Sequence, residues 1–420
     1  TGERGGAIFA SANVTVTLNE SRFNGNESRH EGGAIYNLGT LTATDTRFED
    51  NEAFDFGGAI FNAAGAMLSM NGSLFVDNIS DDRGGAIDNA GSLNVEDSVF
   101  ETNQSFFDGG AIYSTGNFNI DGSTFRGNAV EDDAGALYLA GNAIGEVTNS
   151  TFLDHVADFV QAIYIGGNAS LTLRHVTLVE PGLDSISNQG ELVLQNIVLV
   201  GEIDGDFTDQ GGNIFVDTVA EAGFELDGSG NAVLADNGGP TPTIALMPGS
   251  PALFAGVASA IDTDQRGEPR PQGLAPDAGA FEAEVNATVT LGNLEQVFGE
   301  TGPVTVTTDP PGLDVLVTYS GDDTPPTAAG TYAVRAVTTG EGIFGGALGT
   351  LVITPADQTI TFPEIADQVT TASVTLTATA TSGLPVSLAV EGPAVLDGNS
   401  LSFTGTGSVE ITATQAGNDN

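Results

Sequence analysis

The chain has 420 residues and a formal net charge of −46, with 56 acidic side chains against 10 basic ones. All ten basic residues are arginine, and both halves of the chain are acidic. Nucleic acid and anionic membrane surfaces are therefore excluded as partners, because no basic patch could release their counterions. Cysteine is absent, which excludes disulfides and thiol catalysis, and no apolar run of about 18 residues predicts a membrane-spanning helix.

Residues 5–152 repeat one short pattern. Each copy opens with Gly-Gly-Ala-Ile or a variant of it, and closes with Phe-x-x-Asn, in which His155 replaces the last Asn. The phenylalanines are Phe23, Phe48, Phe75, Phe100, Phe125 and Phe152, spaced by 25 or 27 residues. A fixed period in this range indicates a solenoid, whose repeats bury their apolar faces against their neighbours.

The repeats have a strand period. Segments such as Leu93-Asn94-Val95 alternate apolar and polar residues, and Gly, Asn, Asp and Ser separate them at short intervals. Neither helical spacing nor the spacing of leucine-rich repeats occurs. About 25 residues make one turn of a parallel β-helix, so we predict an all-β solenoid over residues 1–235, with about eight or nine coils. After Ala157 the repeat motif becomes less regular, but apolar residues continue to alternate with polar ones and to point inward.

Equivalent residues of stacked coils should form columns about 4.8 Å apart. We expect the phenylalanines to form an offset stack inside the coil, with a column of Ser or Thr two residues before each of them. The Asn column is expected at a bend, with αL backbone and amides bonded to the next coil. The paired glycines suit a corner that needs positive φ. These columns are interpreted as architecture.

The Gly-Gly-Ala-Ile and Phe-x-x-Asn motifs resemble the repeats of polymorphic outer-membrane adhesins, over roughly residues 1–160. The resemblance implies a right-handed parallel β-helix of the autotransporter type, displayed on a bacterial cell surface with an adhesive role. No membrane β-barrel is visible in the sequence. The chain begins inside a repeat, and we expect it to be part of something longer.

Residues 236–284 are rich in Pro and Gly and are expected to cap the C-terminal end of the β-helix, because an open solenoid end must be covered. The segments at 237–241, 248–252 and 263–267 resemble the end of secreted β-helix proteins of the choice-of-anchor type, with Phe254 in place of the usual acidic residue. Arg266 and Arg270, near Asp262, Asp264 and Asp277, are interpreted as a structural ion-pair cluster.

Two all-β modules are expected after the cap. In residues 285–355 five strand-like runs occur, and residues 329–334 resemble the penultimate strand of MBG-type immunoglobulin-like repeats. Residues 356–420 read as a second immunoglobulin-like β-sandwich, which ends where such sandwiches usually carry one more strand. Either the chain continues beyond Asn420, or a second copy of the protein supplies that strand. The resemblance implies a spacer.

No catalytic, cofactor-binding or metal-binding residue is assigned. A polar column three residues before each Phe includes Asp45 and Asp97, and Glu96 and Asp121 stand one place earlier. Neighbouring carboxylates would repel unless their pKa values were raised or a cation bridged them; Ca²⁺ is the candidate cation, and its presence is left open. His30, His155 and His175 occupy different places in their repeats, which argues against a transition-metal site.

The sequence therefore predicts a non-enzymatic structural and adhesive segment of a large bacterial cell-surface or extracellular-fibre protein. Its partners would be a polysaccharide, a host or neighbouring cell surface, or another copy of itself. The alternative is a polysaccharide lyase or glycoside hydrolase that acts in a groove along the β-helix. The absence of Lys and the scattered Arg weigh against a lyase.

Overall fold

The computed structural model describes residues 3–417 and is almost entirely β-structure. Residues 418–420, at the end of the module that was expected to lack a strand, lie outside this range. The described residues divide into two compact units: residues 3–289 with 308–316 and 337–347, and residues 290–307, 317–336 and 348–417. The first unit contains a parallel β-solenoid of about eight turns, which confirms the fold class predicted from the repeats.

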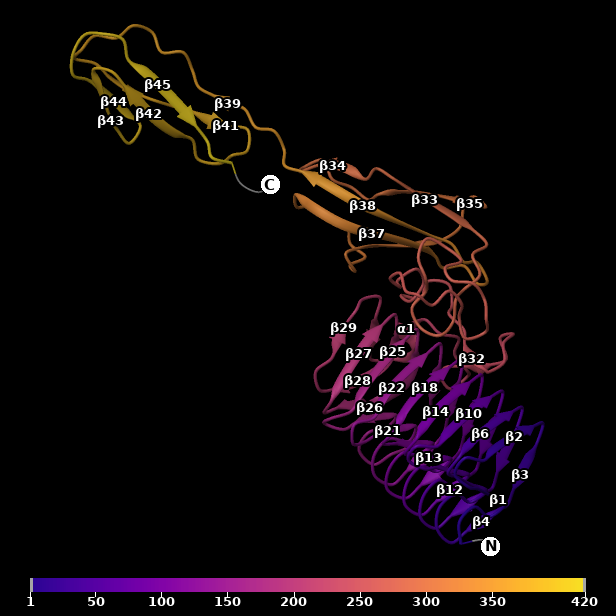
Figure 1. Ribbon diagram of the computed structural model, residues 1–420. Coiled ribbons are helices and arrows are strands. Elements are labelled where there is room, and N and C mark those ends of the chain that lie inside the picture. The colour runs from indigo at the N-terminus through magenta and orange to yellow at the C-terminus, as the bar shows by residue number, and fades with distance from the viewer. Residues whose placement is uncertain (1–2, 418–420) are drawn as a thin grey trace. The chain divides into compact units, whose positions relative to one another are not determined.

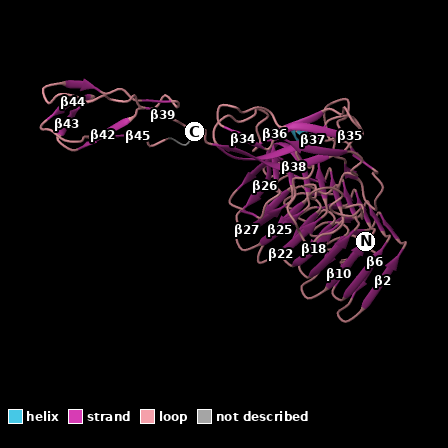
Figure 2. Cartoon of the chain, turned by 90° about the horizontal axis from the view of Figure 1, so that it is seen from above, coloured by secondary structure: helices cyan, strands magenta, loops and turns pink. Residues whose placement is uncertain are grey.

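One side of the solenoid is a nine-stranded parallel sheet, whose strands lie side by side in coil order (Figures 1 and 2). Each full strand has five residues in which inward and outward side chains alternate, as the sequence period predicts. The strands are β2 (Thr15–Asn19), β6 (Thr40–Thr44), β10 (Met67–Asn71), β14 (Ser92–Glu96), β18 (Asn117–Asp121), β22 (Ile144–Thr148), β25 (Ser170–Arg174), β27 (Glu191–Gln195) and β29 (Thr208–Asp209).

The other side of the solenoid is a 16-stranded sheet with two limbs. The first limb follows the Gly-Gly-Ala-Ile motifs: β1 (Ile8–Ala10), β5 (Ile35–Asn37), β9 (Ile60–Asn62), β13 (Ile87–Asn89), β17 (Ile112–Ser114), β21 (Leu137–Leu139) and β24 (Ile163–Ile165). The second contains the phenylalanines: β3 (Arg22–Asn24), β7 (Arg47–Glu49), β11 (Leu74–Val76), β15 (Val99–Glu101), β19 (Thr124–Arg126), β23 (Thr151–Leu153), β28 (Val198–Asp204) and β30 (Ile214–Val216).

A five-stranded sheet lies between these limbs in the first coils. Its strands are β4 (Glu27–Ser28), β8 (Glu52–Ala53), β12 (Ile79–Ser80), β16 (Gln104–Ser105) and β20 (Ala129–Val130). The long strand β26 (Thr177–Asn188) then joins the two limbs, because it pairs with β23 through its first residues and with β24 through its last. The coil that contains β26 therefore lacks the corner strand of the earlier coils, in the region where the repeat motif becomes irregular.

The phenylalanines form the predicted internal stack. Ring centroids of successive coils lie 4.7 Å apart from Phe48 to Phe152, with planes within 7° of parallel, and Phe23 lies 5.1 Å from Phe48. All except Phe23 are completely buried. Leu178 continues the column in the next coil. Offset stacking of this kind contributes about 0.5–1.5 kcal/mol per pair beyond the burial of apolar area.

The asparagines of the Phe-x-x-Asn motif form a continuous amide ladder. Each Nδ2 donates to Oδ1 of the Asn in the next coil, over 2.8 to 2.9 Å. The same Oδ1 accepts the backbone N–H of the preceding Asn, as at Asn78, and Nδ2 also donates to a phenylalanine carbonyl. Buried amides are thereby fully paired. The members are Asn26, Asn51, Asn78, Asn103 and Asn128.

The αL residues of the coils are not these asparagines, contrary to the sequence analysis. Positive φ occurs one residue earlier, at Asp50, Asp77 and Thr102, and also in the polar column three residues before each Phe. That column, here called the αL column, consists of Glu20, Asp45, Gly72, Asp97, Gly122, Asn149, His175 and Asn196, with φ between 43° and 61°. The first glycine of each Gly-Gly pair is also in αL, as predicted.

Helix α1 (Val219–Ala222) follows the solenoid, and a hairpin of β31 (Leu234–Ala235) and β32 (Thr243–Ile244) comes after it. Residues 236–284, here called the lateral segment, contact the side of the later coils. Thr241 Oγ1 donates to Gly122 O, Gln265 Nε2 to Thr124 Oγ1, and the amide of Ala280 to Thr177 Oγ1. This lateral cover was not anticipated. A cap over the open end stays a prediction.

The C-terminal part of the chain forms separate, mostly antiparallel sheets. Its first six strands are β33 (Thr288–Gly292), β34 (Glu295–Val297), β35 (Thr305–Asp309), β36 (Val315–Tyr319), β37 (Gly330–Thr338) and β38 (Gly346–Thr354); β34 pairs with β38 in parallel. The remaining ones are β39 (Ile360–Thr361), β40 (Ser373–Thr375), β41 (Thr379–Ala380), β42 (Ser387–Glu391), β43 (Ala394–Asp397), β44 (Ser400–Phe403) and β45 (Glu410–Thr414). Five runs were expected in residues 285–355, and they correspond to β33 and to β35–β38, whereas β34 was not expected.

Candidate functional site: a lateral groove on the solenoid

A groove of about 610 Å³ runs over the outer face of the nine-stranded sheet. Its floor is one register column, in which equivalent outward residues of five successive coils stand next to each other. The column is Glu96, Asp121, Thr148, Arg174 and Gln195; Asn119 and Glu146 flank it. The sheet thus presents acids, amides, a hydroxyl and one guanidinium at intervals of about 4.8 Å.

Hydrogen bonds between coils fix these side chains. Thr148 Oγ1 donates to Asp121 Oδ1 over 2.5 Å, and Arg174 forms an ion pair with Glu146. Glu96 accepts from Asn94 Nδ2 over 2.9 Å within its own strand. The groove therefore offers an ordered row of acceptors, with one cation neutralised by its neighbour.

Residues 258–261 form one wall of the groove. Two side chains of the αL column hold this wall. His175 Nε2 lies 2.9 Å from Ser259 Oγ, and Asn196 Nδ2 donates to Val257 O over 2.8 Å. Burial, together with repulsion from Arg270, lowers the pKa of His175 to about 3, so its ring is neutral at physiological pH. The αL column thus serves as an attachment line for the lateral segment.

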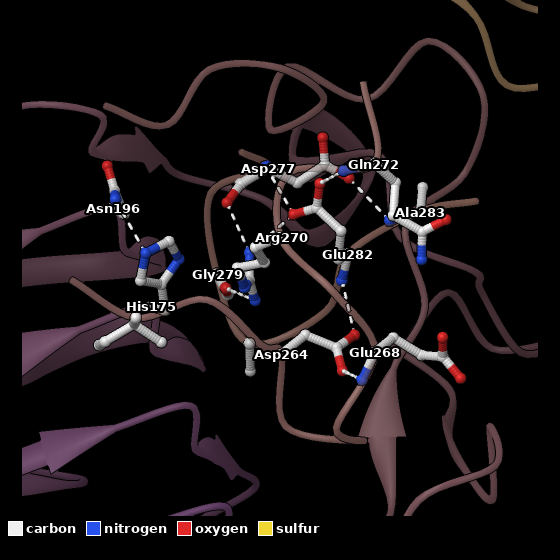
Figure 3. A network of polar contacts seen from close by, with 12 residues as sticks. His175, Asn196, Asp264, Glu268, Arg270, Gln272, Asp277, Gly279, Glu282 and Ala283 are labelled. Carbon is white, nitrogen blue, oxygen red and sulfur yellow. Dashed lines mark hydrogen bonds and ion pairs between the residues drawn. The ribbon is translucent and has the colours of Figure 1, made fainter. Parts of the chain in front are cut away.

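Arg270 organises the interior of the lateral segment (Figure 3). Its side chain is completely buried, and its guanidinium donates to the carbonyls of Asp277 and Gly279, both over 2.8 Å, and to Glu282 Oε2 over 3.0 Å. The Asp277 carboxylate accepts hydrogen bonds from the backbone amides of Phe254 and Ala283, each over 2.7 Å. Burial, together with nearby Glu282, raises the pKa of Asp277.

The ion-pair cluster expected from the sequence exists with partly different partners. Arg266 pairs with Asp264 over 2.7 Å, as expected, and its guanidinium lies 3.7 Å from the centroid of the Phe281 ring. Arg270 pairs with Glu282, which the sequence analysis did not include. These side chains form their ion pairs and hydrogen bonds with one another and with the backbone, so we interpret the cluster as structural.

In the αL column Glu20 and Asp45 stand on adjacent coils, but glycines follow Asp45 and Asp97 in the next coil. A Cβ on Gly72 would lie 2.4 Å from Asp45 Oδ1, and one on Gly122 would lie 2.5 Å from Asp97 Oδ1. Each glycine therefore leaves room for the carboxylate of the coil beside it. Burial, with repulsion from Asp121 and Glu96, raises the pKa of Asp97.

No group of three or more His, Asp or Glu side chains within residues 3–417 is arranged to hold a metal ion. The three histidines have different partners. His30 is exposed and pairs with Asp55 over 2.7 Å. His155 is buried at the end of the amide ladder, with Nδ1 2.5 Å from Glu180 Oε1. The assignment of no site residue stays a prediction.

Sequence reasoning identified Glu96 and Asp121 as neighbours but missed Glu146, Arg174 and the wall of the groove. The floor was within reach of the sequence, because every member stands at one place of the repeat. The wall was not, because residues 258–261 belong to a segment without a repeat.

Two family models match the chain. Residues 20–38 match the Chlamydia polymorphic membrane protein repeat, and residues 287–357 match the MBG domain. No curated protein and no solved structure gives a significant match. Both matched families are non-catalytic domains of surface proteins, and together with the parallel solenoid they fit a β-helix protein of the adhesin type. They support a role at a surface. Within the described residues, no helix is long and apolar enough to cross a membrane.

Proposed function

We propose that the chain is a structural and adhesive segment of a bacterial cell-surface or extracellular-fibre protein, and that the solenoid works as a stiff acidic rod. The observation that carries this proposal is the unbroken stacking of coils through the phenylalanine column and the amide ladder. Such columns resist local opening, because each buried amide would lose partners on both sides. The match to an adhesin-like repeat supports the same reading.

The lateral groove is the proposed contact surface for a polysaccharide. Sugar hydroxyls are hydrogen-bond donors, and the groove presents carboxylate and amide acceptors along one line, with Arg174 as a donor. Each coil contributes one of these polar side chains to the groove floor. A polymeric ligand that runs along the axis would meet a hydrogen-bonding group on each successive coil, and weak contacts would add up to avidity.

Binding of a panel of neutral and amino-sugar polysaccharides to the purified chain tests this proposal. Glu146→Gln and Asp121→Asn should weaken binding by about two- to tenfold, in line with the loss of one hydrogen bond to a charged group. Glu225→Gln, an exposed site outside the groove, is the matched control and should leave binding unchanged. Equal binding by all variants, or none by the wild type, would reject the groove.

Cleavage of a polysaccharide is the second candidate, favoured by one observation. Glu96 and Asp121 are register partners on adjacent coils, and paired carboxylates can share acid and base roles. Incubation with polysaccharides, with and without Ca²⁺, followed by assays for new reducing ends and unsaturated products, separates the two functions. Turnover that disappears in Asp121→Asn would establish the enzyme. Binding without turnover supports the adhesive rod.

A further inference from the structure

The first limb of the 16-stranded sheet carries two neighbouring outward columns on the side away from the groove. The inner one is aromatic, with one interruption: Tyr36, Phe61, Asp88, Tyr113, Tyr138 and Tyr164. Tyr138 stacks on Tyr113 at 5.2 Å and on Tyr164 at 4.6 Å. The column beside it runs Phe56, Arg83, Asp108, Asp133.

Arg83 shows how this face accommodates a guanidinium. Its Cζ lies 4.1 Å from the centroid of the Phe56 ring and 4.4 Å from that of Tyr113, and its Nε is 2.7 Å from Asp88 Oδ2. The arginine therefore sits between two rings and a carboxylate, at the place where Asp88 interrupts the aromatic column. Cation–π contact and charge pairing act together in such an arrangement.

Further along the same columns the rings and carboxylates continue without a cation. A hollow of about 620 Å³ is lined by five aspartates, namely Asp132, Asp133, Asp158, Asp184 and Asp204, and among the described residues no basic side chain lines it. Burial and repulsion from Asp132 and Asp133 raise the pKa of nearby Asp108 to about 6. The surface thus carries unbalanced negative charge beside the rings.

Large aromatic side chains are exposed at the rim of this hollow and in the coil before it. Phe159 is 65% exposed and lines the hollow with Tyr164, and Phe107, next to Asp108, is 48% exposed. Exposed aromatic residues in a contiguous patch mark interaction sites on soluble proteins.

We propose that this face, defined by Tyr164, Phe159 and the aspartates of the hollow, docks an arginine-rich polypeptide segment of another protein. Charge complementarity selects a cationic partner, and the rings select guanidinium over ammonium, because a planar guanidinium stacks on aromatic faces. The partner's arginines would repeat the arrangement that Arg83 makes within the chain. This proposal is independent of the polysaccharide groove, which lies on the other sheet.

Fluorescence anisotropy with labelled nona-arginine, at a salt concentration of about 150 mM, tests the docking face. Phe159→Ser and Tyr164→Ser should each weaken binding by about two- to fivefold, the range of one exposed cation–π contact. Asp132→Asn combined with Asp158→Asn should weaken it by about tenfold. Nona-lysine should bind more weakly than nona-arginine.

Two matched controls separate a site from general attraction to an acidic protein. Asp217→Asn with Glu225→Gln removes the same charge elsewhere, and Phe207→Ser removes an exposed ring elsewhere; both should leave the affinity within about twofold. Equal losses in the test and control variants, equal binding of nona-lysine, or no binding at all would overturn the proposal. If chitosan oligomers bound more tightly than nona-arginine, and the same variants lost that binding, the ligand of this face would be an amino-sugar polymer and the peptide proposal would be overturned.

Discussion

The amide of Asn196 is paired with the backbone of Val257, 61 residues later, through two hydrogen bonds: Val257 N donates to Asn196 Oδ1 over 2.7 Å, and Asn196 Nδ2 donates to Val257 O over 2.8 Å. This pairing joins the solenoid to the lateral segment beside the groove. Asn196 also has positive φ, so glycine can replace it without backbone strain.

Asn196→Gly should therefore loosen the lateral segment while the coil stays folded. Loss of both hydrogen bonds should speed tryptic cleavage after Arg266 by about tenfold, because that bond becomes accessible more often. Mass spectrometry of timed digests measures the rate. Asn149→Gly, in the same αL column but without a bond to Val257, is the control. Equal cleavage rates in both variants and the wild type would show that the segment is held by other contacts.

Phe100 lies in the middle of the internal stack and is completely buried between Phe75 and Phe125. Phe100→Ala should lower the free energy of unfolding by about 3–5 kcal/mol, since a cavity opens and two ring contacts are lost. Urea unfolding followed by circular dichroism gives the value. Phe106→Ala, at an exposed ring, should cost less than about 1 kcal/mol. Similar costs at the two sites would contradict the stack as a source of stability.

The amide ladder makes a second prediction about stability. Asn78→Ala removes the acceptor shared by the backbone amide and Nδ2 of Asn51, together with one of the donors to Asn103 Oδ1, so buried polar groups lose hydrogen bonds on two coils. The expected loss is about 2–5 kcal/mol, because each unsatisfied group costs about 1–3 kcal/mol. Asn119→Ala, on the exposed face of the nine-stranded sheet, should change the urea midpoint little. A ladder that contributed nothing would give equal midpoints.

The buried pair of His155 and Glu180 ends the ladder, and its energy can be isolated by a double-mutant cycle. His155→Asn restores the residue of the repeat, but it leaves Glu180 buried without its partner and should cost about 3–5 kcal/mol. Adding Glu180→Gln should recover part of that loss, because the buried charge is then removed. Strictly additive single and double variants would mean that the two side chains do not interact.

The raised pKa of Asp108 leads us to predict that the stability of the folded chain depends on pH. Burial raises its pKa in the folded chain to about 6, above the value of about 3.9 for an unfolded aspartate. Between about pH 4 and pH 6 the folded state keeps a proton that the unfolded state has lost, so stability falls as the pH rises through this window. Asp108→Asn should reduce this slope.

Urea midpoints of wild type and Asp108→Asn between about pH 4 and pH 7.5 measure the slope. Asp217→Asn is the control, because Asp217 is exposed and belongs to neither outward column of the first limb; its curve should run parallel to that of the wild type. An unchanged slope in Asp108→Asn would show that other carboxylates, among them buried Asp88, determine the pH dependence.

The solenoid could be predicted because its information is local and repeated. Six copies of two motifs set the period, and the registers Phe75 to Phe100 and Arg22 to Arg47 followed from it. A second amide ladder, from Asn37 through Asn62 to Asn89, was equally readable from the residue two places after each Ile, yet it was overlooked.

The αL column could have been recognised by its residue types, since Asp, Asn and Gly are those that tolerate positive φ. A glycine follows Asp45 and Asp97 in the next coil, which relieves crowding there, whereas Glu96 and Asp121 stand on adjacent coils as the sequence analysis expected. The lateral segment was out of reach for another reason. Gln265 meets Thr124 across 141 residues, and no periodicity encodes a contact of that kind.

The amide ladder also gives the solenoid a direction. From Asn26 onward every side-chain amide donates toward the C-terminal end, and at the last step Asn128 Nδ2 lies 3.4 Å from His155 Nε2, while Nδ1 of the same ring faces the Glu180 carboxylate. The aligned amides thus end at a buried pair of His155 and Glu180. Duplication of one internal repeat would insert a donor and an acceptor together and leave both ends unchanged. Length can therefore vary by whole coils, with no new type of contact to evolve.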